Sequence, residues 1–218
     1  MTLSAHSNPY GYRELLVYTK AEEMQKACAS LTNAFVERVK REKGGGMGLK
    51  TIIALQDQMD RSARSVKQNI VEGWKRNSTQ EYHQFLGFSL GANAELEEDC
   101  NDVIKGMYKG IKGVKGVGMP MGEVEKLPFY PLDTHLPPLV KLKLRCKELN
   151  MLLGKLQRSL VAKMSSEHRL PLVEMQRQAL AREAQNDKWI QREREKWEKG
   201  DERGKEKGVG DKREKGLL

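Results

Sequence analysis

The sequence predicts an all-α protein, namely an antiparallel four-helix bundle with a charged, helical to disordered C-terminal extension. Four long segments carry apolar residues at steps of three and four, as a helix with one buried face requires. Charged residues make up 32% of the 218 residues and aromatic residues only 6%, a balance typical of helical bundles. A chain of this length can bury one good core, so we expect residues 1–165 to form the bundle.

The first two predicted helices occupy residues 12–39 and 49–76. The glycines at 44–46 and 48 separate them, because glycine gives a helix little reason to continue. Each segment has an apolar stripe at helical spacing, which we expect to face the core. The two stripes are Val17, Ala21, Met24, Cys28, Leu31 and Phe35, and Ile52, Met59, Ala63, Val66, Ile70 and Trp74.

The third and fourth predicted helices occupy residues 78–107 and 139–163, and an irregular, mobile Gly/Lys/Pro connection at about 108–138 joins them. Ser78 and Glu81 form a capping box that begins the third helix. The fourth helix has leucines in near-heptad steps. The stripes are Tyr82, Phe85, Ser89, Ala92, Leu96, Val103 and Met107, and Leu142, Cys146, Leu149, Leu153, Leu156 and Leu160.

The composition changes after Ser165. We expect residues 166–199 to form a charged helical extension around Trp189 and Trp197, and residues 200–218 to be disordered, because they combine high charge with almost nothing to bury. The two tryptophans either dock on protein or stack on a nucleic-acid base.

The positive charge is unevenly distributed. The net charge is +9, and residues 111–165 hold ten basic but only four acidic residues. Such an excess attracts phosphate polyanions. The alternative is an ordinary solvated surface.

Several classes of protein are disfavoured. No segment is long and apolar enough to span a membrane, and we expect no secretory signal. The three cysteines, Cys28, Cys100 and Cys146, lie far apart on apolar stripes and suggest buried thiols in a reducing cytoplasm. The four histidines form no metal-binding pattern, and the glycine runs match neither a P-loop nor a dinucleotide fingerprint. We therefore expect no metal, no cofactor and no enzymatic activity.

The second predicted helix carries small and polar residues beside its apolar stripe. These are Ser65, Asn69, Glu72 and Gly73, and residues three or four apart share one helix face. They resemble a catalytic set, but the same spacing serves a packed polar seam against the third helix. We interpret them as a structural seam with Glu95, which is also a possible partner of Arg61 or Arg64.

Basic residues on the second and fourth helices are the candidates for nucleic-acid contact, because phosphate binding needs cations at a regular pitch. The candidates are Arg61, Arg64, Lys75, Lys141, Lys143, Arg145, Lys147, Lys155 and Arg158. The alternative is solvation and pairing within each helix.

The hairpin sequence RSARSVKQNIVEGWKRNSTQEYHQFL, with YRELLVYTKA before it and AELEED after it, resembles one known family. This is the four-helix bundle family of the ribosomal RNA intervening-sequence protein and of the accessory variability determinant (Avd) of diversity-generating retroelements. The matching positions are Arg61, Ala63, Ser65, Val66, Asn69–Gly73, Arg76, Ser78, Glu81, Tyr82, Phe85, Leu86, Glu95 and Leu96.

The resemblance implies a homo-oligomer, usually a pentamer, with a basic outer surface. In the retroelement members of the family the bundle partners a reverse transcriptase in mutagenic cDNA synthesis, whereas the ribosomal intervening-sequence members have no settled activity. We favour a non-enzymatic accessory factor that binds RNA or DNA and resembles the retroelement members, with a reverse transcriptase as a possible partner. The alternative is a protein-only oligomeric scaffold or adaptor of the same fold, which uses its C-terminal extension to recruit a partner.

Overall fold

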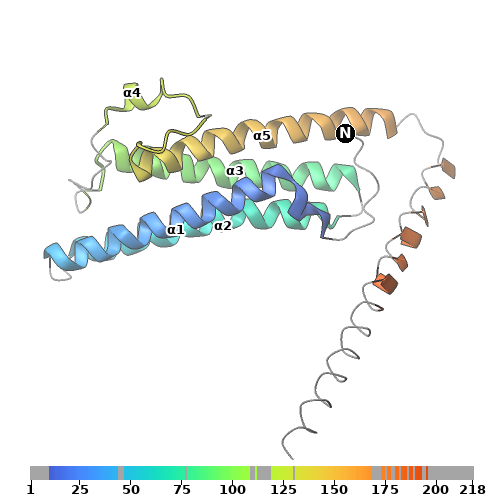
Figure 1. The fold of residues 1–218 in the computed structure, drawn as a ribbon, viewed down its shortest axis with the longest axis horizontal. Helices are drawn as coiled ribbons and strands as arrows, with labels where there is room; N and C mark the ends of the chain where they lie inside the picture. Colours follow the sequence, from blue (N-terminus) through green and yellow to red (C-terminus); the bar gives the residue numbers. More distant parts are fainter. Residues whose placement is uncertain are drawn as a thin grey trace, which may run out of the picture. The chain divides into compact units, whose positions relative to one another are not determined.

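The computed structural model describes residues 10–43, 47–76, 78–108, 111, 119–129 and 131–167, and scattered residues between 173 and 195. One compact unit spans Tyr12–Ser166. Its described elements are all helices, which confirms the predicted all-α fold (Figure 1). They are the 3-10 turn η1 (Gly11–Glu14), α1 (Leu16–Lys43), α2 (Met47–Trp74), α3 (Thr79–Ile104), α4 (Met121–Val124) and α5 (Pro138–Glu167).

The four long helices form an antiparallel bundle in which α1 and α3 each lie between α2 and α5. Side-chain contacts link each neighbouring pair, and the residue numbers run in opposite directions along the two helices. One contact from each pair is Thr32–Asp60 at 3.1 Å, Ser62–Glu95 at 3.3 Å, Asn93–Cys146 at 2.9 Å and Lys20–Glu148 at 3.2 Å. The predicted bundle is therefore confirmed.

The predicted apolar stripes form the core. Every stripe residue named for α1 and α2 is buried, and so are most of those named for α3 and α5. Met107 is the clear exception, because it lies beyond the end of α3 and is 67% exposed. Phe85 and Leu156 are only half-buried.

Local signals explain both ends of α3. The Ser78 Oγ accepts a hydrogen bond from the Glu81 N–H at 3.1 Å, as a capping box requires. At the other end Gly106 has a φ of +78°, and the N–H groups of Gly106 and Met107 donate to the carbonyls of Val103 and Asp102. This Schellman motif ends the helix three residues before the predicted end at Met107.

The connection between α3 and α5 departs from the expected irregular loop. It contains the short helix α4, and Ile111 and Val124 are 1% and 0% exposed. The Met121 sulfur lies 3.7 Å from the Lys143 Nζ of α5. This part of the connection thus packs on the bundle and covers the N-terminal half of α5.

The three cysteines are free and buried, as expected for small apolar residues. Burial raises the pKa of the Cys28 thiol, and the nearby Asp60 raises it further. The pKa of Cys100 is also raised, by its contact with Cys146 and by burial. The Cys28 and Cys100 thiols therefore remain protonated and unreactive at neutral pH.

The described residues between Val173 and Glu195 are helical, and Val173, Leu180 and Ile190 are exposed. Trp189, Trp197 and residues 200–218 lie outside the described residues, so what we expect of them stays a prediction.

Candidate nucleic-acid interface

The polar residues of α2 that we assigned to a seam do not all face α3. Gly73 does, because a Cβ at this position would lie 2.6 Å from the Tyr82 Cδ2 and 2.8 Å from the Phe85 Cβ. Ser65 and Asn69 are half-buried, whereas Glu72 is exposed. Gly73 is therefore the point of closest approach in the α2–α3 hairpin.

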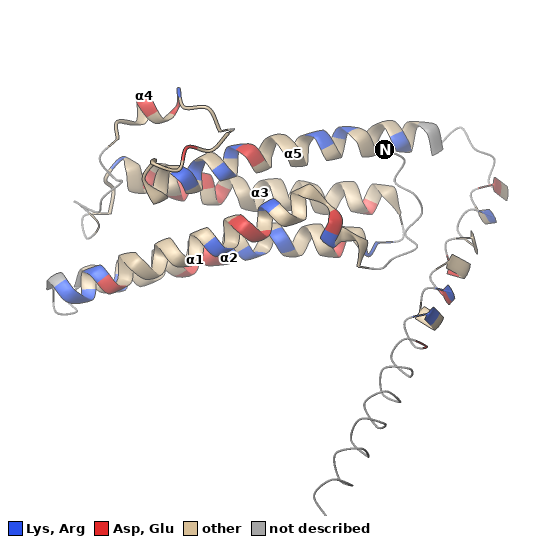
Figure 2. Cartoon of the chain, viewed as in Figure 1, with Lys and Arg blue, Asp and Glu red and all other residues tan. Residues whose placement is uncertain are grey.

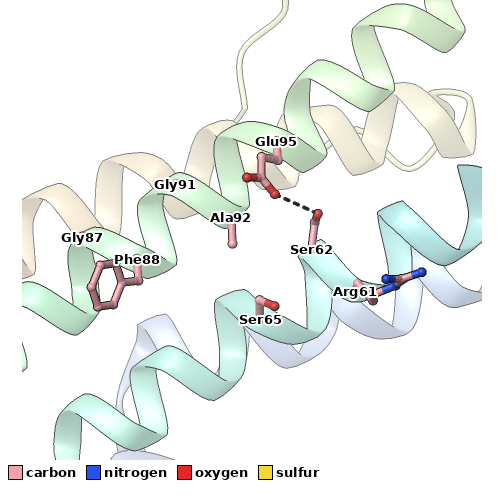
Figure 3. A pocket seen from close by; sticks show the side chains of 8 residues that line it. All are labelled: Arg61, Ser62, Ser65, Gly87, Phe88, Gly91, Ala92 and Glu95. Carbon is pink, nitrogen blue, oxygen red and sulfur yellow. Dashed lines mark hydrogen bonds between the residues drawn. The ribbon is translucent and has the colours of Figure 1, made fainter.

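The polar contacts across the hairpin come partly from residues outside the predicted seam. Ser89 donates a buried hydrogen bond to the Val66 carbonyl at 2.6 Å. Glu95 accepts from Ser62 at 3.3 Å, and not from Arg61 or Arg64 as we had considered (Figure 3). The reason is local, since Ser62 lies one turn before Val66 on the face that α3 covers.

A groove of about 410 Å³ opens on the outer side of this hairpin. Figure 3 shows Phe88 beside the hollow, with Ser65 and Ala92 along it and Arg61 and Glu95 at the far end. Phe88 is 52% exposed. No atom lies within 4 Å of the position that a Cβ at Gly91 would take, so this glycine leaves space in the groove.

A second polar cluster links α2 and α3 nearer the α1–α2 turn. The Gln58 amide donates to the Asp99 Oδ1 at 2.7 Å, while the buried Oδ2 has no partner among the described residues. Burial raises the pKa of Asp99 to about 6, and the nearby carboxylates of Asp102 and Glu95 add to this effect. Ionised Asp99 is therefore a cost to the fold at neutral pH.

We expect Asp99→Asn to stabilise the protein in a pH-dependent way. The carboxyl of an unfolded chain has a pKa near 3.9, so the folded state binds the proton more tightly and loses stability as the pH rises from about 4 to 6. The amide keeps an acceptor for Gln58 and removes the buried charge. The gain in the free energy of unfolding should be about 1–2 kcal/mol at about pH 7.5 and close to zero near pH 4. Urea unfolding at both pH values measures it, and an equal gain at both would refute this assignment.

Three arginines among the nine predicted phosphate-binding residues have side-chain partners within the bundle. The Arg61 guanidinium lies 3.5 Å from the Asp57 carboxylate, and the Arg145 guanidinium lies 2.9 Å from that of Glu23. Arg64 donates to the Gln68 side-chain carbonyl at 3.2 Å once the amide is oriented to satisfy both groups. Pairing of this kind leaves less charge for an external phosphate.

Lys143 corrects the expectation of an exposed basic face on α5. It is 2% exposed, and its ammonium group donates to the Asn101 Oδ1. The α4 segment covers this side of α5, so Lys143 cannot contact a phosphate outside the bundle. Lys141 is half-exposed and donates to the Thr134 carbonyl at 2.8 Å.

The remaining four cations fall into three places. Lys155 and Arg158 are exposed on the C-terminal half of α5, and Lys75 is exposed at the α2–α3 turn. Lys147 is half-buried and faces an apolar cavity instead. Gln157 donates to the His83 carbonyl at 3.2 Å, which fixes the C-terminal half of α5 beside the start of α3.

Residues 13–105 match the family model of the 23S rRNA-intervening sequence protein. This segment, which is less than half of the chain, is similar to that family. The match covers η1 and α1–α3 with the whole α2–α3 hairpin, so the resemblance recognised in the hairpin is confirmed there. Helix α5 and its exposed cations lie outside the matched residues of the 23S rRNA-intervening sequence protein family. Neither a curated protein nor a solved structure matches the chain.

Two further features of the described part of the chain bear on function. None of its helices is long and apolar enough to cross a membrane. This part of the chain contains no group of three or more His, Cys, Asp or Glu side chains that could hold a metal ion.

Proposed function

We propose that this protein is a non-enzymatic accessory factor that binds nucleic acid through the C-terminal half of α5. Residues 149–165 contain three basic residues and no acidic one. Figure 2 shows this part of α5 with blue basic residues and no red acidic ones. Lys155 and Arg158 are exposed there and three residues apart, so they share one helix face. Among the described residues neither forms an ion pair. This pair of exposed cations is the observation that carries the proposal.

Further cations lie at the same end of the bundle. Because α3 and α5 are antiparallel, the contact between Gln157 and His83 brings residues 155–163 beside the α2–α3 turn. That turn carries Lys75 and Arg76, both exposed, and the Arg76 guanidinium lies over the Phe85 ring at 4.4 Å. Several cations at one end give a surface on which a phosphate backbone can make more than one contact.

RNA is the nucleic acid that we favour, because the matched family takes its name from a sequence within 23S rRNA. The resemblance of the hairpin to the accessory variability determinant supports a finer proposal, in which the protein holds RNA or cDNA for a reverse transcriptase. The free thiols suit the reducing cytoplasm, where we propose that it acts.

We also propose that the protein self-associates, as a pentamer in the version that the resemblance favours, through the outer face of the α2–α3 hairpin. Phe88 is a large apolar side chain left 52% exposed beside a hollow that Gly91 keeps open. A protruding ring next to an unfilled groove can pack against a neighbouring copy, and a pentamer requires this contact to be heterologous, so that the hairpin face of one copy meets a different face of the next. Several copies would then present several basic ends, and avidity would strengthen weak contacts at each.

Phe88→Ser combined with Gly91→Leu should dissociate the assembly, because one change removes the ring and the other fills the groove. Light scattering of the wild type should give several times the chain mass of 24.8 kDa, and the double variant should give 24.8 kDa. Val161→Ser on α5, which also removes an exposed apolar side chain, is the control and should leave the mass unchanged. A wild-type monomer, or an unchanged mass for the double variant, would contradict this interface.

Deletion of the residues after Glu167 separates the accessory role from the alternative of a protein-only adaptor. The accessory role predicts that RNA affinity stays within about threefold, because the proposed contacts lie on the bundle. The adaptor role instead requires the extension for capture of a protein partner. Fluorescence anisotropy with a labelled structured RNA measures the affinity. Loss of RNA binding on deletion of the extension would contradict the proposal that the bundle makes the RNA contacts.

A further inference from the structure

A second and larger hollow lies on the opposite side of the bundle from the α2–α3 hairpin. It has a volume of about 840 Å³ and lies between the start of α1, the middle of α5 and the segment that follows α4. This volume is within the range of sites that bind small organic molecules. Nothing in the proposed nucleic-acid role uses it.

Apolar side chains form most of its wall. They come from three separate parts of the chain, and the protein itself leaves them uncovered: Leu16 is 56% exposed, and Met151 and Leu152 are half-buried. The segment after α4 closes the other side with Leu127, Pro128 and Phe129. A ligand with an apolar body would remove this surface from water, which is the main source of affinity in such sites.

The charges of the wall are not equivalent. Lys20 and Glu148 pair with each other at 3.2 Å, and the Glu148 residue is only 8% exposed, so these two groups satisfy one another. Lys147 is half-buried beside the apolar wall and forms no ion pair with a described residue. Glu125, the other charge of the wall without an ion pair to a described residue, is exposed and remains solvated. Lys147 therefore attracts a negatively charged ligand more strongly than Glu125 attracts a positively charged one, because charges interact more strongly where water is partly excluded.

We propose that this cavity binds an amphipathic organic anion, such as a long-chain carboxylate. The apolar chain lies against Leu16, Phe129 and Met151, and the acidic group meets the Lys147 ammonium. This site is independent of the proposed nucleic-acid surface, whose cations Lys155 and Arg158 lie farther along α5.

The test uses the full-length protein and a fluorescent long-chain polyene fatty acid as the probe. We expect saturable binding of one probe per chain with a Kd on the order of 1–10 μM. Lys147→Met should weaken binding about tenfold, the loss expected for one charged hydrogen bond. Lys50→Met removes an exposed lysine of α2 and should leave the Kd unchanged.

Leu16→Glu is the second variant, and it should keep the fold. Leu16 is exposed and is the first residue of α1, where an acidic side chain is favourable. It adds a negative charge to the wall and should weaken probe binding at least tenfold. Non-fluorescent fatty acid should displace the probe, and the matching fatty alcohol should compete poorly. Absence of saturable binding, equal competition by the alcohol, or unchanged binding in both variants would each overturn the proposal.

Discussion

Reversal of Lys155 and Arg158 to glutamate should lower the affinity for a structured RNA about 100-fold at about 50 mM salt, because each lost phosphate contact forfeits its share of counterion release. Both side chains are exposed, so the fold should be unaffected. Fluorescence anisotropy with a labelled RNA measures the change. The helical content by circular dichroism should match that of the wild type.

The matched control reverses two exposed lysines elsewhere on the bundle. Lys50 is in the first turn of α2, and Lys105 caps the C-terminus of α3, at the end of the bundle away from Lys155. The Lys50→Glu and Lys105→Glu double variant changes the net charge by the same amount. If it weakens RNA binding as much as the α5 variant does, the charge acts non-specifically and the α5 surface is wrong.

Gly73→Ala should destabilise the protein by about 2 kcal/mol, although alanine favours a helix more than glycine does. The added Cβ would lie 2.6 Å from the ring of Tyr82 and 2.8 Å from the Phe85 Cβ. Tyr82 is 4% exposed and its ring packs edge-on against Trp74 at a centroid distance of 6.2 Å, so it has little room to move. The midpoint of urea unfolding should fall accordingly.

Gly48→Ala in the same helix provides the opposite expectation. No atom lies within 4 Å of the position of a Cβ there, so only the helix propensity changes. The variant should be as stable as the wild type or more stable by up to about 1 kcal/mol. Equal effects of the two substitutions would show that α2 and α3 do not approach each other closely at Gly73.

Most of the bundle could be predicted because its determinants are local. The apolar stripes of α1 and α2 report directly on which face is buried, and the Ser78 cap needs only residues four apart or fewer. The matched family segment, residues 13–105, coincides with the part whose hairpin motif was most specific. Tertiary context was not needed for these features.

The features that the sequence did not reveal depend on contacts between distant segments. Lys143 is buried because the α4 segment, about twenty residues earlier, packs over it, and the amide of Asn101 receives its ammonium. The run LVKLKL at 139–144 does indicate burial on more than one side, since its apolar residues are not confined to one helix face. The cavity beside Lys147 likewise combines three separate segments, so the periodicity of a single helix does not predict it.

The salt dependence of RNA binding tests the central claim most directly. We would titrate the wild type and the Lys155→Glu and Arg158→Glu double variant with a labelled structured RNA by anisotropy across a range of salt concentrations. The account predicts that log Kd rises with log salt with a slope of several units in the wild type, and that the double variant loses about 1.4–1.8 units of it, at 0.7–0.9 per phosphate. A wild-type slope near zero, or an equal slope in both proteins, would contradict nucleic-acid binding through α5.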